Sequence, residues 1–335
     1  MSTGHPLSGL VVTAMAATVS LSSLAGCSRP SMLISMVDGR QALTETTLER
    51  DSWWAIDKIV VIEVSGILTN SPKVQLLGEG EHPVSVLLEK LTKARRDPTV
   101  KAVILRINSP GGTVVASELM HDEIRRFKES GKPVVAVMMD VAASGGYYIA
   151  CACDEIAAQP STITGSIGVV LQMIDVSRTM DLIGVKADAI TSGEHKDTGS
   201  PFRPMRPEER ELFQQIIDEM YGRFVKVVAA GRPGLDEDGV RAIADGRVYT
   251  ATQAVELGLI DRIATMREVI AGLKQRIGRK NIRLVTYHRY LDYKPNYYAA
   301  APRSPVGDVN LLNIDLSTRL TPPTPRFMYL WCPGY

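Results

Sequence analysis

PVVAVMMDVAASGGYYIACA (residues 133–152) changes character halfway along. Its first part, Pro133 to Met139, is rich in strand-forming residues, whereas the part from Tyr147 to Ala152 is apolar and leads into a helix. Ser144 therefore falls where a strand turns into a helix, and two conformationally permissive glycines follow it. Backbone N–H groups at such a turn point toward whatever the hydroxyl attacks, and they would stabilise an oxyanion there. The position favours a nucleophile, although most Ser-Gly-Gly triplets are simply turns.

A serine nucleophile needs a base, and the segment Ser192-Gly193-Glu194-His195-Lys196-Asp197 offers one. Lys196 can serve if burial lowers its pKa, because desolvation disfavours the ammonium and leaves a neutral amine that accepts the hydroxyl proton. The alternative is a solvated surface lysine. A histidine base has less support, since only His195 lies in a glycine-containing loop and His121 is expected at a helix surface. A carboxylate near the amine would raise its pKa, so we expect Asp197 to point away.

A second turn follows the apolar strand from Ala102 to Ile107, in the segment Asn108-Ser109-Pro110-Gly111-Gly112. Its two glycines permit backbone conformations closed to other residues, and we expect Gly112 to open an amphipathic helix. An acyl-transfer site needs two N–H donors near the developing oxyanion, one beside the nucleophile and one from another loop. This turn can supply the second donor, or it can be a helix start that binds nothing. The apolar stripe of the expected helix consists of Ala116, Met120, Ile124 and Phe127.

The rest of the chain alternates between strand-like and helical patterns, which indicates an α/β protein. Strands are expected at residues 58–64, 102–107, 133–139, 167–173 and 185–191. Helices are expected at residues 84–94, 115–128, 180–182, 207–230, 240–244 and 251–257.

Four segments, taken in order, closely resemble the signal peptide peptidase A family of serine proteases. They are Ser109-Pro110-Gly111-Gly112, Ala143-Ser144-Gly145-Gly146-Tyr147-Tyr148, Thr164-Gly165-Ser166-Ile167-Gly168 and Ser192-Gly193-Glu194-His195-Lys196-Asp197. The resemblance covers about residues 57–272 and extends to the later segments 244–250 and 258–261. It implies an α/β fold of the Clp-protease or crotonase type, in which βα units wind into a spiral with additional helices.

Carried over residue by residue, the resemblance implies a Ser/Lys dyad. The implied nucleophile, general base, oxyanion donors and lysine-orienting residue are Ser144, Lys196, Gly145 with Gly111 or Gly112, and Ser166. Neither a metal nor an organic cofactor is needed, because the amine activates the serine and later the water that hydrolyses the acyl-enzyme. The implied substrates are remnant signal peptides and other short or unfolded apolar peptides, bound as an added strand. The family forms rings or domes whose dyad residues can come from adjacent modules, so a homo-oligomer is implied.

The amino terminus resembles a lipoprotein signal. Residues 6–26 carry no charge, and Leu24-Ala25-Gly26-Cys27 resembles a bacterial lipobox, after which Cys27 would be lipidated. The protein would then be a membrane-anchored lipoprotein of the cell envelope, with its catalytic domain outside the cytoplasm. The alternative is an uncleaved helix, since about 20 apolar residues also span a bilayer. The expected divisions are a signal peptide (1–26), a tether (27–56), a peptidase domain (57–272) and a Tyr/Pro-rich tail (273–335).

Composition limits the other functions. The 335 residues include 38 basic and 37 acidic ones without a basic block, so we expect no nucleic-acid binding. A crotonase-type acyl-CoA enzyme would need carboxylates that residues 142–146 do not supply, whereas a non-catalytic envelope lipoprotein scaffold stays open. Cys151 and Cys153 lie in an apolar stretch and are expected to be buried free thiols. The apolar segment Phe327 to Trp331 is either a sticky terminus or docks on the body, on a neighbour or in the substrate groove.

Overall fold

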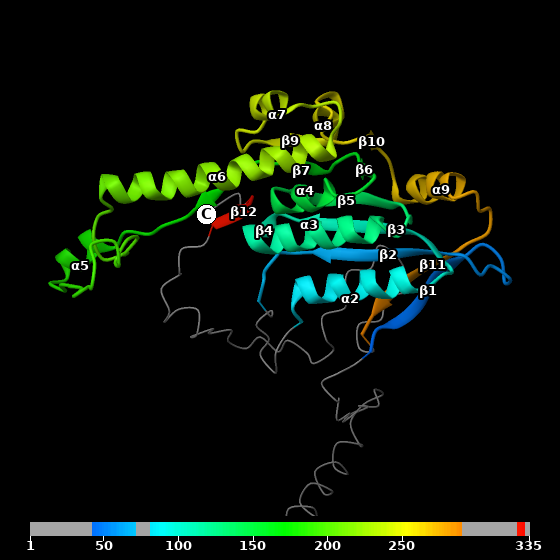
Figure 1. Cartoon of the computed structure of the whole chain (residues 1–335), viewed down its shortest axis with the longest axis horizontal. Coiled ribbons are helices and arrows are strands. Elements are labelled where there is room, and N and C mark those ends of the chain that lie inside the picture. The colour runs from blue at the N-terminus through cyan, green and yellow to red at the C-terminus, as the bar shows by residue number, and fades with distance from the viewer. Residues whose placement is uncertain (1–41, 72–80, 290–326, 332–335) are drawn as a thin grey trace, which may run out of the picture. The chain divides into compact units, whose positions relative to one another are not determined.

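A parallel sheet forms the centre of the computed structural model, which describes residues 42–71, 81–289 and 327–331. The strand order is β1-β11-β2-β3-β5-β6-β10 (Figure 1). Neighbours on this path are parallel except for the edge pair of β1 and β11. These strands are β1 (Thr44–Arg50), β2 (Lys58–Ser65), β3 (Val100–Ser109), β5 (Val134–Ala143), β6 (Glu155–Ala158), β10 (Arg262–Ile263) and β11 (Arg283–His288). The expected α/β class is confirmed.

Helices cover both faces of this sheet, because the strands of a parallel sheet are apolar on both sides. Alternate residues enter separate cores: Val60 and Val103 contribute to one, and Ile59 and Ile104 to the other. The first core packs against α2, α3, α4 and α6, and the second against α9. The bounds are α2 (Pro83–Arg96), α3 (Val114–Lys128), α4 (Gly145–Ala150), α6 (Pro207–Gly231) and α9 (Met266–Arg276).

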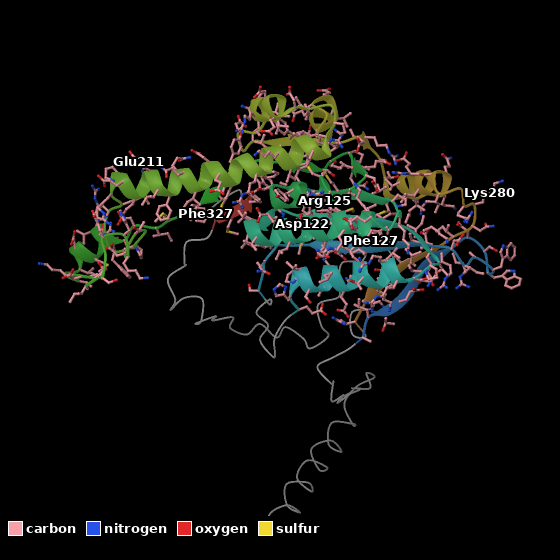
Figure 2. The ribbon with its side chains drawn as sticks, in the orientation of Figure 1. Asp122, Arg125, Phe127, Glu211, Lys280 and Phe327 are labelled. Atoms are coloured by element: carbon pink, nitrogen blue, oxygen red, sulfur yellow. The ribbon has the colours of Figure 1, made fainter. Side chains whose placement is uncertain are left out.

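Helix α3 shows how the sequence pattern directs this packing. Phe127 is buried, whereas Asp122 and Arg125 are exposed (Figure 2). The expected apolar stripe is confirmed by the burial of Ala116, Met120, Ile124 and Phe127. The helix begins at Val114, two residues later than expected, because the Thr113 side chain caps it by accepting a hydrogen bond from the first turn.

A smaller sheet has the strand order β4-β12-β8, with both pairings antiparallel. It joins three distant segments, β4 (Gly111–Thr113), β8 (Val170–Leu171) and β12 (Phe327–Leu330). A further strand, β7 (Ile163–Gly165), continues the main sheet by pairing with the end of β5 and with β9 (Val248–Thr250). The apolar tail segment therefore docks on the body of its own chain, as the middle strand of the smaller sheet.

Two expectations for the region around residues 167–191 are wrong. The strand expected at 167–173 shortens to β8, and residues 185–191 form no strand. All residues from 185 to 191 are exposed and follow α5 (Ser177–Leu182), which lies at the end of α6 farthest from the sheet (Figure 1). Strand-forming residues need a paired strand and a buried face, and this segment has neither. The later helices are confirmed as α6, α7 (Glu237–Ile243) and α8 (Ala251–Glu256).

The main sheet extends beyond residues 57–272 at both ends. β1 comes from the expected tether, and β11, from the expected tail, pairs with β2 in parallel. Without β11, the core strand β2 would have an open edge. Cys151 and Cys153 are buried free thiols, as expected. None of the helices in the described part of the chain is long and apolar enough to cross a membrane, and Cys27 and the other residues of the expected signal lie outside that part.

Candidate active site

Ser144 occupies a tight turn between β5 and α4. Its backbone has φ +52° and ψ −116°, a conformation that residues other than glycine rarely adopt. The turn is held on both sides, because the Ser144 N–H donates to the Gly165 carbonyl at 2.7 Å and the Ser144 carbonyl accepts from the Tyr148 N–H at 2.8 Å. The predicted strand-to-helix position is therefore confirmed. The Ser144 Oγ is buried and has no hydrogen-bond partner among the described residues.

Glycines allow a second backbone segment to approach this turn closely. A Cβ on Gly145 would lie 2.4 Å from Ser117 Oγ and 3.2 Å from the Gly112 nitrogen. A Cβ on Gly112 would lie 1.9 Å from the Leu68 carbonyl oxygen, so neither position tolerates a side chain. The amides of Gly145 and Gly112 therefore meet near the nucleophile, as an oxyanion hole requires.

The amide of Gly111 is engaged elsewhere. Its N–H donates to Ser109 Oγ at 3.1 Å, and this hydroxyl donates to the Gly66 carbonyl at 2.7 Å. Ser109 therefore stabilises the turn. Of the two glycines that the sequence left open as the second oxyanion donor, the geometry favours Gly112.

Ser166 lies beside the nucleophile through the backbone. It follows Gly165, whose carbonyl accepts the Ser144 N–H, and it has a φ of +50°. Its own N–H donates to the Arg247 carbonyl at 2.7 Å, and the residue is buried. The structure thus brings together four of the expected site residues, Ser144, Gly145, Gly112 and Ser166.

The structure does not join Lys196 to this group. Lys196 is exposed on the segment between α5 and α6, whereas the Ser144 Oγ is buried without a hydrogen-bond partner in the described part of the chain. This segment lies at the protruding end of α6, away from the sheet (Figure 1). A single chain therefore presents the expected nucleophile and the expected base in separate places.

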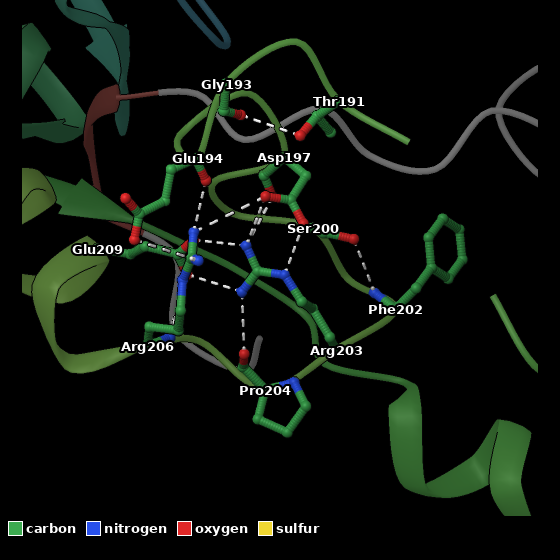
Figure 3. A network of polar contacts seen from close by, with 10 residues as sticks. All are labelled: Thr191, Gly193, Glu194, Asp197, Ser200, Phe202, Arg203, Pro204, Arg206 and Glu209. Carbon is green, nitrogen blue, oxygen red and sulfur yellow. Dashed lines mark hydrogen bonds and ion pairs between the residues drawn. The ribbon is translucent and has the colours of Figure 1, made fainter. Parts of the chain in front are cut away.

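Arginine and carboxylate side chains fix the lysine's segment to the start of α6 (Figure 3). Arg203 donates to the Asp197 carboxylate at 2.7 and 2.9 Å and to the Glu209 carboxylate at 2.5 and 2.9 Å. Arg206 donates to Glu209 Oε1 at 2.7 Å and to the Glu194 carbonyl at 2.8 Å. The hydrogen bonds from Arg203 hold the pKa of the buried Glu209 well below its usual range. Glu209 therefore stays ionised and ties both arginines together.

Asp197 uses its carboxylate in the same network. Hydrogen bonds from Arg203 lower its pKa, and both of its oxygens accept from that guanidinium. This arrangement supports the expectation that Asp197 points away from the Lys196 amine. Sequence reasoning missed Glu209, because a glutamate at the third position of a helix that starts with proline is an ordinary capping residue. Nothing local in the sequence shows that two arginines converge on it.

His121 was expected at the surface, and this is wrong. Only 6% of the residue is exposed, and its ring contacts the edge of Tyr148 at a centroid distance of 5.2 Å. Burial lowers the pKa of this histidine. The reason is that α3 packs against α4 as well as against the sheet, so its buried face is wider than the four-residue apolar stripe.

Comparison with known proteins gives a consistent result. The profile described as Peptidase family S49 matches residues 126–280. The chain is 36% identical over 237 residues to the protein named "Putative signal peptide peptidase SppA" of Enterococcus faecium, which covers 71% of this chain and 68% of that protein. It is also 35% identical over 261 residues to the chloroplastic serine protease SPPA of Arabidopsis thaliana, covering 75% of this chain and 37% of that protein.

Proposed function

The chain belongs to peptidase family S49 and is a serine peptidase, and on this premise we propose that Ser144 is its nucleophile and Lys196 its general base. The observation that carries the proposal is the strained Ser144 turn beside the converging amides of Gly145 and Gly112. Strain of this kind persists only where the surroundings hold it, and it is concentrated at functional sites. The fold is the Clp-protease or crotonase-like α/β fold implied by the family.

The proposed reaction is acyl transfer through a covalent intermediate. The neutral amine of Lys196 takes the Ser144 proton as Oγ attacks the peptide carbonyl, and the amides of Gly112 and Gly145 stabilise the oxyanion. The lysine then gives its proton to the departing amine. A water deprotonated by the same lysine releases the acyl group, while Ser166 orients the lysine.

We propose that the dyad forms between two copies of the chain. The Ser144 Oγ is buried and unpartnered among the described residues, whereas Lys196 is exposed on a protruding element. A base on such an element can reach a neighbour's nucleophile in a closed ring, where each subunit offers its lysine to the next. A homo-oligomer would then be needed for catalysis.

The substrates and the location are proposed from the resemblance and the sequence. The enzyme would degrade remnant signal peptides and other short or unfolded apolar peptides. A lipid on Cys27 would hold it to a membrane of the cell envelope, with the catalytic domain outside the cytoplasm. Apolar peptides partition to that surface, so tethering would raise their concentration near the site.

A serine-reactive phosphonate tests the nucleophile. We expect wild-type protein to be labelled at Ser144, because the buried oxyanion site stabilises the tetrahedral adduct. Peptide mapping by mass spectrometry identifies the labelled residue. Ser161→Ala, at an exposed serine, is the control and should leave labelling unchanged. Labelling elsewhere, or equal labelling of Ser144→Ala, would contradict the assignment.

Glu209→Ala is expected to lower kcat for peptide hydrolysis by about tenfold or more, because the lysine's segment loses the anchor that holds Arg203 and Arg206. A faster amide hydrogen exchange of residues 190–206 should accompany the loss. The matched control is Glu208→Ala, since Glu208 is the exposed neighbour in the same helical turn. Unchanged kcat together with faster exchange would show that the segment does not position the base.

A further inference from the structure

The tail strand β12 lies between the two strands that flank the site. β4 contains Gly112, and β8 begins four residues after Ser166. In the antiparallel register Tyr329 faces Gly112, and Met328 is paired on both sides. A peptide that adds a strand to a sheet edge uses the same backbone pairing. β12 therefore shows how an extended chain fits the groove between β4 and β8.

The hydrogen-bond pattern assigns a position to Tyr329. The Trp331 N–H donates to the Pro110 carbonyl at 2.8 Å. Hydrogen-bonded and non-bonded pairs alternate along an antiparallel ladder, so Tyr329 and Gly112 form the next bonded pair. In that pair the Gly112 N–H faces the Tyr329 carbonyl.

The other proposed oxyanion donor lies beside the same carbonyl. A Cβ on Gly111 would lie 2.0 Å from the Tyr329 carbonyl oxygen and 2.8 Å from the Gly145 nitrogen. The oxygen and the nitrogen thus flank a single point. Tyr329 therefore occupies the place of the residue whose carbonyl Ser144 attacks, on the acyl side of the bond to be cleaved.

The side chain of Tyr329 fills an aromatic pocket completely. Its ring stacks on Tyr148 at a centroid distance of 5.2 Å and an interplanar angle of 23°, and lies 4.7 Å from the Phe224 ring. Its hydroxyl donates to the Met220 carbonyl at 2.9 Å. No part of the residue is exposed. The pocket is therefore apolar along its walls and ends in one hydrogen-bond acceptor.

We propose that this pocket gives the peptidase its specificity, and that the enzyme cleaves after tyrosine, with the Met220 carbonyl reading the hydroxyl. The inference rests on the proposed function, since it takes Ser144 as the nucleophile. Phenylalanine fits the walls but leaves out the hydrogen bond, and alanine leaves the pocket unfilled. Lysine and aspartate would lose their hydration without gaining a charge partner from Tyr148, Phe224 or Met220.

The test compares peptides of one sequence in which only the residue before the cleaved bond differs: tyrosine, phenylalanine, leucine, alanine or lysine. kcat/KM is measured with the wild-type full-length chain, and mass spectrometry locates each cut. The chain's own β12 competes equally with every peptide, so the ratios between peptides are unaffected. Tyrosine should exceed phenylalanine by roughly threefold to tenfold, and alanine by about 100-fold or more. Equal or faster cleavage after leucine or alanine would overturn the proposal, and phenylalanine equal to tyrosine would overturn the role of Met220.

A binding measurement separates this inference from the proposed function. The full-length double variant Ser144→Ala, Tyr329→Asp cannot bury its own strand, and fluorescence anisotropy gives the affinity of each labelled peptide for it. If wild-type protein hydrolyses no peptide but tyrosine still binds most tightly, the proposed function fails and the pocket stands. Equal affinities across the series would overturn the pocket whatever the hydrolysis shows. Circular dichroism checks the fold of the variant, and the wild-type ratios decide if it is unfolded.

Discussion

Replacing Ser144 with alanine lowers kcat for peptide hydrolysis by about 1,000-fold or more, and replacing Lys196 with alanine does the same. Either change removes one half of a unit that acts together, so the losses should not add in the double variant. The measurement is the hydrolysis of a fluorogenic peptide by variants whose assembly size is first confirmed by light scattering.

Matched controls exist on the chain for both substitutions. Lys186→Ala changes another exposed lysine between α5 and α6, and Ser161→Ala changes an exposed serine of the body. Both should keep wild-type kcat. Full activity in Lys196→Ala would move the base to another residue, and full activity in Ser144→Ala would remove the nucleophile assignment altogether.

Mixing two inactive variants restores activity if the dyad forms between subunits. When chains with Ser144→Ala and chains with Lys196→Ala are co-expressed in equal amounts, about a quarter of the sites combine an intact serine with an intact lysine. Activity should therefore return to about a quarter of the wild-type value, because only those sites contain both reacting groups.

The comparison that checks this result uses differently tagged chains, purified in tandem so that every assembly contains both. Ser144→Ala co-expressed with the double variant lacks intact serines and should stay inactive. A tandem-purified mixture of the two single variants with no activity would show that each site uses residues of one chain.

The sequence predicted what depends on local pattern. The change from strand to helix at Ser144 is encoded by the residues on either side of it, and the buried stripe of α3 follows from helical periodicity. The strand expected at 185–191 was wrong, because composition alone does not provide a pairing partner.

Contacts between distant segments could not be predicted from local pattern. Glu209 looks like a capping residue until Arg203 and Arg206 are seen to converge on it. Tyr329 is separated from Gly112 by more than 200 residues, and its register on β4 depends on the completed fold. The tail could be suspected of docking because it is apolar, but the residue that enters the aromatic pocket could not be identified.

The position of β12 also bears on the protein's solubility. β4 and β8 are short strands whose backbone edges would otherwise stay open, and open edges recruit extended chains from other molecules. Apolar peptides released near a membrane are the kind of chain that such edges would recruit into aggregates. By pairing both edges with its own backbone, the chain protects an adhesive surface between encounters with substrate.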